Sequence, residues 1–279
     1  MQIINRKDLP LDHGYYRTCS PVYKEYLCKC GLQIHEIWGE KFWWIKSIFG
    51  LFQVSKFERL DEEPNIEKLK KAGFQHWLII WIPYSKIDIP AWWKKLWLNS
   101  HFTTTWFTKI EDEKYYQKWK QRAKRARKKF LDDEETKIIL VDRENFIKNY
   151  KESKISQPFK SEFIKYYTTL SALDWKGNIK SMICFHKDRV VAGLAVIEYN
   201  GNSSAHLVSF LTNEGKNLQA WTWLIDYWFA ISLQNNIKYI NFDHLRDKFM
   251  PRDQQGYTDF KENFMENKVV FNDSYFKII

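Results

Sequence analysis

The stretch "IKSMICFHKDRVVAGLAVIEYNGNSSAHLVSFLT" (residues 179–212) predicts three antiparallel strands joined by two tight turns. The turns are expected at "HKD" (186–188) and "NGN" (200–202), where short polar groups separate the apolar runs. The apolar sequence that follows predicts one long buried helix over 216–234. A membrane span is not expected there, because the run is short and Asp226 lies at its middle.

The rest of the 279-residue chain alternates between strand and helix patterns, which indicates an α/β protein. In chain order, the expected elements are strands within 34–58, a helix at 65–73 ending at Gly73, a strand at 74–85 ended by Pro83, a helix beginning near Pro90, a strand at 101–110, a strand at 137–142, helices at 143–153 and 158–174, and, after the segment above, a strand at 237–245 and closing segments at 256–264 and 268–278. The length suits two compact lobes or one large domain, and the two α/β patterns favour two lobes of similar plan.

The segment "KWKQRAKRARKK" (118–129) contains eight Lys or Arg and no acidic residue. Removing these eight charges from the formal net charge of +10 leaves +2 for the remainder of the chain. The positive charge is therefore concentrated in one segment. Such a distribution indicates a binding surface for a polyanion more than a generally basic protein.

In helical register this segment carries one narrow apolar stripe, at positions i, i+4, i+7 and i+11: Trp119, Ala123, Ala126 and Phe130. The stripe predicts an ordered helix that docks by one edge, with basic side chains over the rest of its circumference. Acidic residues at 111–113 and the basic pair Lys128 and Lys129 would then match the helix dipole at its two ends. A solvated linker helix is the alternative.

The chain has four cysteines, and three of them are close together near its beginning: Cys19, Cys28, Cys30 and, far from these, Cys184. The C-x-C spacing is tighter than zinc sites usually have, so we expect buried free thiols and no metal site. The opening residues "MQIINRKDLPLDHG" do not read as a signal sequence. We therefore expect a cytoplasmic protein, with the inner face of the membrane as an alternative location.

Four motifs, taken in order, resemble those of the Fem family of aminoacyl-tRNA-dependent peptidyltransferases, which add amino acids to peptidoglycan precursors. They are the basic "KWKQRAKRARKKF", the hairpins "KDRVVAGLAVIEYNGNSSAHLVSFLTNEG", the strand "KYINFDHL" and the closing "GYTDFKENF". The resemblance implies an α/β (α+β) fold of two GNAT-like lobes, with mixed sheets flanked by helices. We accordingly expect an N-terminal lobe at 1–110, a basic linking helix at 111–135 and a C-terminal lobe at 136–279.

The resemblance also implies the activity. The expected reaction moves an amino acid from aminoacyl-tRNA to an amine of a nucleotide-linked or lipid-linked peptidoglycan precursor, with aminoacyl-tRNA as co-substrate and no other cofactor. A coenzyme A enzyme needs a Gly-rich loop before its long helix to hold the pyrophosphate, whereas this chain has "TNEGKNLQAW" with a single Gly. A GNAT-type acyltransferase using coenzyme A or another carrier is one alternative. A non-catalytic RNA- or membrane-binding protein on a transferase scaffold is the other.

The candidate catalytic residues are Lys261, Asp243 and His244. Lys261 matches the Lys of the family's closing F-K motif, which lies where it can neutralise the donor's ester or terminal phosphate. Asp243 and His244 stand at the end of a predicted strand, where a general base would be well placed. They also mark a departure, because the family usually has an Asp-Phe-Gly-Gly sequence here and this chain has Asn241 in place of the acid.

The candidate phosphate-binding residues lie on the basic helix: Arg122, Lys124, Arg125, Arg127, Lys128 and Lys129. Neutralising several phosphates gives sequence-independent, salt-sensitive affinity, which suits the acceptor arm of many tRNAs. The same residues could instead face the pyrophosphate of the acceptor or a membrane surface. The sequence leaves these alternatives open.

Overall fold

The computed structural model describes residues 2–3, 21–36, 42–48, 52–58, 60–71, 78–83, 87–96, 104–153, 160–199, 201–244, 259–265, 267–270 and 272–279. The chain forms two compact units: unit 1 consists of Met1–Gln2, Trp106–Leu245 and Arg252–Lys268, and unit 2 of Ile3–Thr105, Arg246–Pro251 and Val269–Ile279. This division differs from the expected domain ranges. The basic segment lies within unit 1, and the end of the chain returns to unit 2.

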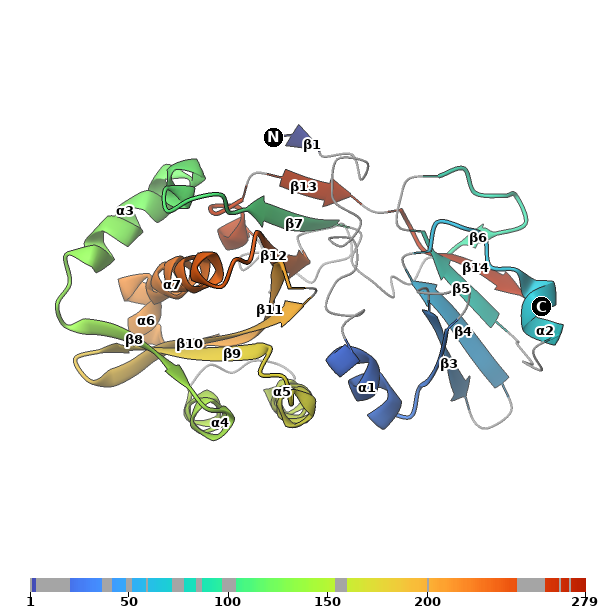
Figure 1. Ribbon diagram of the computed structural model, residues 1–279, viewed down its shortest axis with the longest axis horizontal. Helices are drawn as coiled ribbons and strands as arrows, with labels where there is room; N and C mark the ends of the chain where they lie inside the picture. The colour runs from blue at the N-terminus through green and yellow to red at the C-terminus, as the bar shows by residue number, and fades with distance from the viewer. Residues whose placement is uncertain are drawn as a thin grey trace. The chain divides into compact units, whose positions relative to one another are not determined.

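Unit 1 contains, within the described residues, an eight-stranded mixed sheet of order β1-β13-β7-β12-β11-β10-β9-β8 (Figure 1). Its strands are β1 (Gln2–Ile3), β13 (Asn267–Val270), β7 (Thr104–Lys109), β12 (Tyr239–His244), β11 (Ser203–Leu211), β10 (Arg189–Tyr199), β9 (Ile179–His186) and β8 (Thr136–Val141). Strands β8 to β11 pair antiparallel, and β11 pairs parallel with β12. The predicted three-strand segment is confirmed as β9, β10 and β11.

The two predicted turns of this segment are confirmed as well. Lys187 and Asp188 both have positive φ, at 49° and 59°, which is the backbone of a two-residue hairpin turn that matches the twist of its strands. Gly201 has φ of 67° in the second turn. The hairpin chemistry visible in the sequence therefore sets the register of the central strands.

Helices cover both faces of this sheet, as Figure 1 shows. One face carries α3 (Gln121–Leu131), α6 (Asn213–Leu218) and α7 (Ala220–Gln234), and the other carries α4 (Arg143–Glu152) and α5 (Lys160–Leu173). The aromatic side chains of α7 form much of the core, with Trp223, Trp228 and Phe229 almost completely buried. Trp228 donates its indole N–H to the Ser204 hydroxyl at 2.8 Å, so the burial of this polar atom is compensated.

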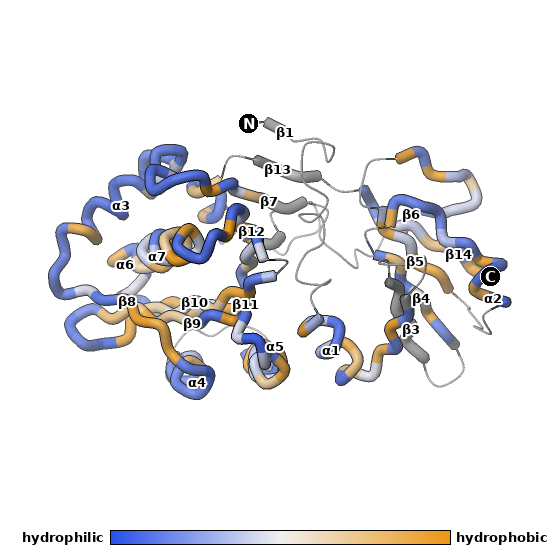
Figure 2. The backbone as a smooth tube through the Cα atoms, in the orientation of Figure 1, coloured by the Kyte–Doolittle hydropathy of each residue, from blue (hydrophilic) through white to orange (hydrophobic). Residues whose placement is uncertain are grey.

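The basic segment folds as a short 3-10 helix at Tyr115–Lys118 followed by α3, which docks against α7. Its apolar stripe is confirmed from Ala123 to Phe130, whereas Trp119 precedes the N-cap Lys120 and has extended backbone angles. Trp119, Ala123 and Ala126 are buried, and Phe130 stacks on Trp223 with ring centroids 5.1 Å apart. Along most of its length α3 is hydrophilic, in contrast to the strands β9 and β10 (Figure 2). The helix is thus attached by one edge, as the register predicted.

A buried ion pair fixes α3 on α7 in addition to this apolar contact. The Arg127 Nε donates to an Asp226 carboxylate oxygen at 2.7 Å, and the Tyr115 hydroxyl donates to the same oxygen at 3.0 Å. The Arg127 guanidinium also lies over the Tyr116 ring, 4.0 Å from its centroid. Burial raises the pKa of Asp226, and the hydrogen bond and charge of Arg127 oppose that rise.

Unit 2 contains, within its described residues, a six-stranded sheet of order β2-β3-β4-β5-β14-β6. Its strands are β2 (Gln33–Glu36), β3 (Phe42–Ile48), β4 (Phe52–Glu58), β5 (Leu78–Ile82), β14 (Tyr275–Ile278) and β6 (Lys94–Lys95), and its helices are α1 (Pro21–Lys29) and α2 (Ile66–Lys71). The pairs are antiparallel except for β4 with β5, which is parallel. A small apolar core around Phe57, Ile79, Trp81 and Trp93 holds this unit together.

Several local predictions were wrong. No helix begins near Pro90 in the described residues, which turn at Ala91 and Trp92 and continue into the short strand β6. The acidic residues 111–113 do not begin the basic helix, since α3 has Lys120 at its N-cap and no acidic residue in its first turn. Gly73 lies outside the described residues.

Two of the cysteines also differ from expectation. Cys28 and Cys30 are exposed at the end of α1, whereas Cys184 is buried in β9, and burial raises its thiol pKa to about 12. Cys19 lies outside the described residues. Among the helices that the structure describes, none is long and apolar enough to cross a membrane.

We predict that Arg127→Met destabilises the chain by about 3 kcal/mol at pH 7, because it leaves the Asp226 carboxylate buried without its counter-charge. When the pKa of a carboxyl is higher in the folded than in the unfolded chain, raising the pH through these two pKa values lowers the free energy of unfolding, because the buried group must ionise. The variant raises this pKa further, so its deficit should grow between about pH 4 and pH 7. Urea unfolding across this range measures the deficit.

The matched control for this experiment is Arg125→Met, which removes an exposed basic side chain from the same helix. Its unfolding free energy should stay close to that of the unmodified chain at every pH. An Arg127→Met deficit that is independent of pH would contradict the assigned role of Asp226.

Candidate functional site

A pocket of about 500 Å³ opens in unit 1 where four elements meet: the start of α3, the end of β11, the junction of α6 with α7, and the turn at 259–264. Its lining residues are Arg122, Ala123, Leu211, Lys216, Gln219, Trp221, Thr222, Asp259, Phe260 and Asn263. The rim is basic through Arg122 and Lys216, and the wall is aromatic through Trp221 and Phe260. This combination suits a ligand that is both anionic and ring-containing.

The pocket lies where two parallel strands separate. The register of β11 with β12 pairs Ser203 with Tyr239 and Ala205 with Asn241. In the part of the chain that the structure describes, this pairing ends at Ala205, although both strands continue. The register of β11 with β10 shifts nearby, which marks a β-bulge. In α/β sheets, ligands bind beyond the carboxyl ends of strands at such points of separation.

One backbone carbonyl holds α6 at the end of β11. The register of β10 with β9 shifts between Val190 and Ala192, so the intervening Val191 has no opposite residue in β9 and forms a β-bulge. Its carbonyl oxygen accepts hydrogen bonds from both the backbone N–H and the hydroxyl of Thr212, each at 3.0 Å. The Thr212 hydroxyl in turn accepts from the backbone N–H of Gly215 at 3.0 Å and caps α6.

The single Gly of "TNEGKN" serves this close packing. A Cβ placed on Gly215 would lie 2.1 Å from the Val191 carbonyl oxygen, so a larger residue would push α6 away from β10. The sequence suggested that this Gly was too isolated for a pyrophosphate loop. The structure gives it another role, which is to let a short helix approach the sheet.

The predicted long helix at 216–234 is interrupted at Gln219. This residue has left-handed backbone angles, φ 61° and ψ 32°, and it separates α6 from α7. Gln219 makes no side-chain capping hydrogen bond to α7. The start of α7 places the positive end of the helix dipole beside Trp221 and Thr222 of the pocket, and the Thr222 backbone N–H donates to the Gln219 carbonyl at 2.9 Å.

The turn at 259–264 forms the opposite wall. Phe260 contacts Trp221 edge-to-face with ring centroids 5.9 Å apart. The turn is tied to the start of α3, because the Lys120 backbone N–H donates to the Asn263 carbonyl at 2.8 Å. Behind Trp221, the His206 ring lies 5.9 Å away and its Nε2 is 3.0 Å from the Ser209 hydroxyl. Both aromatic walls are thereby supported from behind.

Lys261 lies beneath the pocket and is completely buried. Its ammonium donates to the Phe242 carbonyl of β12 at 2.6 Å, which ties the 259–264 turn to the sheet. The other two candidate catalytic residues, Asp243 and His244, occupy the last two positions of β12, and their side chains lie outside the described residues. The structure therefore brings Phe260, but not the Lys261 ammonium, to the pocket surface.

The six candidate phosphate-binding residues fall into three groups. Arg127 points inward and is bound by Asp226 and Tyr116. Arg122 lines the pocket, and with Arg125 and Lys129 it follows the spacing i, i+3 and i+7, which places the three on one face of α3. The remaining candidates are Lys124, which is half-buried, and Lys128, which is exposed.

Sequence reasoning missed Lys216, Gln219 and Trp221. Lys216 lies in "TNEGKNLQAW", where a lone Lys in a polar stretch carries no motif of its own. A left-handed Gln between two helices leaves no signal in an apolar, helix-forming stretch. Trp221 is indistinguishable by sequence from the buried aromatic residues that follow it.

We predict that Gly215→Ala costs about 1–3 kcal/mol of stability and displaces α6 from the sheet, because the new methyl group would overlap the Val191 carbonyl. Thermal unfolding measures the first effect. Asn217→Ala, on the exposed surface of the same helix, is the control and should leave the midpoint almost unchanged. Equal midpoints for the two variants would contradict the close approach.

No protein-family model and no curated protein sequence matches the chain. Its structure does resemble solved structures. The crystal structure of FemX aligns with a TM-score of 0.72 over 100% of this chain and 97% of the FemX chain, at 11% sequence identity. A conserved protein of unknown function from Bacteroides thetaiotaomicron aligns with a TM-score of 0.57 over 93% of this chain and 90% of its own, at 12% identity.

These alignments span both units of the chain, and the two mixed sheets flanked by helices match the predicted fold class. At such low identity the likeness is one of fold. The chain therefore shares the fold of FemX, as its four sequence motifs indicated.

Proposed function

We propose that the chain is an aminoacyltransferase, which moves an amino acid from aminoacyl-tRNA to an amine of a peptidoglycan precursor. The observation that carries this proposal is the pocket in unit 1, whose basic rim continues along α3 from Arg122 to Arg125 and Lys129. The 3′ end of a charged tRNA offers a base, phosphates and an aminoacyl ester. Each of these parts has a chemical counterpart at this site.

The aromatic walls suit the terminal base. Trp221 is buried and meets Phe260 edge-to-face, and Phe264 supports Phe260 from 5.1 Å, so the half-buried Phe260 ring presents a fixed surface for stacking. Stacking of a nucleic-acid base on an aromatic side chain contributes about 1–3 kcal/mol per base and depends little on sequence. The pocket volume of about 500 Å³ lies within the range of sites that enclose small ligands.

The basic residues suit the phosphates that precede the terminal base. Arg122 and Lys216 stand at the pocket, while Arg125 and Lys129 extend the same positive face along α3. From Arg122 to Lys129 the helix rises about 10 Å. The backbone of a bound acceptor arm could therefore follow the helix away from the pocket. Such contacts hold any tRNA without reading its sequence.

The coenzyme A alternative has less support at this site. A pyrophosphate would need free backbone N–H groups in the loop before the helix, and here the Gly215 N–H is bound by the Thr212 hydroxyl. The helix that follows this cap, α6, has six residues and ends at the break. The helix whose start lines the pocket is instead α7, through Trp221 and Thr222.

The chemistry needs little from the protein beyond positioning. The amine of the acceptor attacks the ester carbonyl, the C–O bond to the ribose breaks, and the proton lost by the amine ends on the ribose oxygen. The positive dipole end at the start of α7 would stabilise the oxyanion formed on the way. Lys261 positions the turn that carries Phe260, because its ammonium is bound to the Phe242 carbonyl. We place this reaction in the cytoplasm.

We predict that the double variant Arg125→Glu/Lys129→Glu weakens binding of aminoacyl-tRNA at least about tenfold and lowers the slope of log affinity against log salt by about two. The reason is the loss of two phosphate contacts from the exposed face of α3. Fluorescence anisotropy with labelled aminoacyl-tRNA, at several salt concentrations, measures both quantities. Acetyl-coenzyme A, titrated in parallel, should show no comparable binding.

Lys148→Glu/Lys151→Glu is the charge-matched control, since both lysines are exposed on α4, on the opposite face of the sheet from α3 (Figure 1). It should leave tRNA affinity nearly unchanged. Equal losses for this control and the α3 variant would mean that total charge, not the helix, governs binding. Tight binding of acetyl-coenzyme A without any of aminoacyl-tRNA would overturn the proposed donor.

A further inference from the structure

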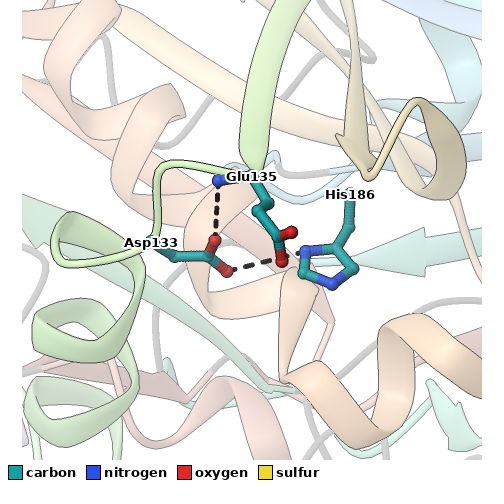
Figure 3. A group of neighbouring side chains, drawn as sticks. All are labelled: Asp133, Glu135 and His186. Carbon is teal, nitrogen blue, oxygen red and sulfur yellow. Dashed lines mark hydrogen bonds and ion pairs between the residues drawn. The ribbon is translucent and has the colours of Figure 1, made fainter.

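A second group of polar side chains lies at the other end of α3, outside the proposed transferase site. Asp133 and Glu135 follow the helix, and His186 ends β9 fifty residues later in the antiparallel partner of β8. One ligand atom from each of the three lies within 4.8 Å of the other two. Figure 3 shows the two carboxylates and the imidazole converging on one point.

Strand pairing brings these residues together. Thr136, the first residue of β8, lies opposite His186 in the sheet. The Thr136 hydroxyl is 2.9 Å from the Asp133 carboxylate and 2.9 Å from the His186 Nδ1. The other Asp133 oxygen accepts the Glu135 backbone N–H at 2.9 Å. Both Asp133 and His186 are therefore held in place before any ligand arrives.

The position of the imidazole distinguishes this group from an ordinary acidic surface. The His186 Nδ1 is 3.6 Å from Asp133, and the two side chains are only 12% and 18% exposed. A carboxylate can only accept a hydrogen bond, so the single hydroxyl proton of Thr136 goes to Asp133 and its oxygen accepts from the His186 Nδ1–H. To bind a cation between the two carboxylates, the imidazole would carry its proton on Nε2 instead, so that the Nδ1 lone pair becomes the third ligand.

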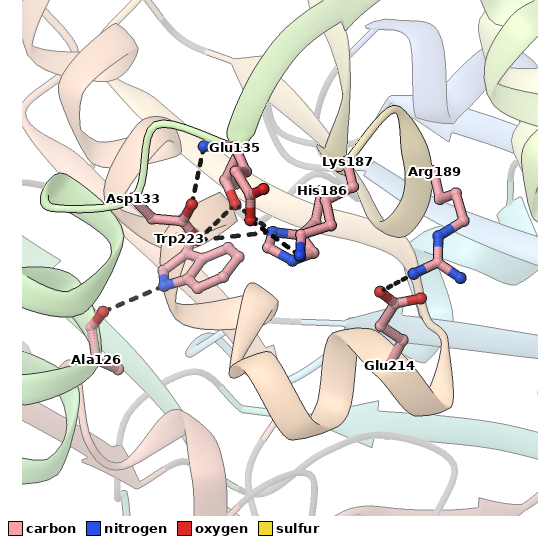
Figure 4. A network of polar contacts seen from close by, with 9 residues as sticks. Ala126, Asp133, Glu135, His186, Lys187, Arg189, Glu214 and Trp223 are labelled. Carbon is pink, nitrogen blue, oxygen red and sulfur yellow. Dashed lines mark hydrogen bonds and ion pairs between the residues drawn. The ribbon is translucent and has the colours of Figure 1, made fainter.

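Charge at the cluster also favours a cation. Asp133 and Glu135 belong to "DDEE" (132–135), an acidic run in a chain of net charge +10 that the transferase proposal does not use. The Lys187 ammonium, 3.2 Å from a Glu135 oxygen, supplies a local positive charge (Figure 4). Glu135 and Lys187 are both more than half exposed, so this ion pair can open at little cost.

We propose that Asp133, Glu135 and His186 bind one divalent transition-metal ion, with Zn²⁺ the best match. One imidazole nitrogen and two carboxylate oxygens are ligands that suit Zn²⁺, whereas Ca²⁺ and Mg²⁺ favour oxygen alone. Three protein ligands leave a fourth position for water. The ion would clamp the end of α3 to the β9–β10 turn and so stabilise unit 1, whatever donor the pocket takes.

The test uses the full chain with Cys19, Cys28 and Cys30 changed to Ser, so that the thiols of the N-terminal region do not compete for metal. Isothermal titration with Zn²⁺ should give one ion per chain. Co²⁺ titration should give the visible absorption of a four-coordinate site. His186→Gln should abolish both signals, and Thr136→Val, which removes the orienting hydroxyl, should weaken Zn²⁺ affinity about 10–100-fold.

Two neighbouring variants make the test specific. Asp188→Asn removes an exposed carboxylate on the same turn, which pairs with Lys137, and should leave Zn²⁺ affinity unchanged. Lys187→Met removes the competitor of the ion for Glu135 and should tighten binding. If His186→Gln does not fold, as circular dichroism would show, the exposed Glu135→Gln takes its place. Unchanged affinity in the ligand variants, equal loss in Asp188→Asn, or the absence of saturable binding would each overturn the proposal.

Discussion

The docking of α3 on α7 is the contact on which the proposed transferase site depends. It joins a strongly basic helix to the most aromatic helix of the chain, and two alanines allow the backbones to approach closely. The Trp223 indole donates to the Ala126 carbonyl at 3.1 Å, and Arg127 meets Asp226 beneath the contact. The buried Trp223 indole N–H and the Asp226 carboxylate therefore both have partners on α3, which holds the basic helix against α7.

This arrangement divides the positive charge into two roles. Arg127 has a structural role, because its charge balances the buried Asp226 carboxylate of α7. Arg122, Arg125 and Lys129 face outward on one side of the helix. A segment that looks uniformly basic in sequence therefore contains one arginine that fixes the helix and several residues that the fixed helix presents to a ligand.

The pocket itself depends on backbone features more than on side-chain chemistry. A bulge at Val191 turns a carbonyl toward Thr212, Gly215 lets α6 approach, and Gln219 breaks the helix at the level of the pocket. Together they expose the start of α7 where β11 and β12 separate. An anion is attracted by such a helix end because the helix dipole adds to the charges of Arg122 and Lys216.

The sequence alone determined the hairpins of β9 to β11, the apolar stripe of α3 and the fold class, because these follow from local turn chemistry and side-chain periodicity. It could not show that α3 belongs to unit 1, that Gln219 interrupts the long helix or that Lys261 is enclosed, since each depends on contacts between residues far apart in the chain. Arg127 and Arg125 are equivalent in the sequence and become different only when Asp226 approaches from α7, 99 residues beyond Arg127. Side-chain periodicity is a local property of the sequence, whereas an ion pair such as Arg127 with Asp226 joins distant segments. For this reason only the tertiary structure decided which basic side chains remain available for a ligand.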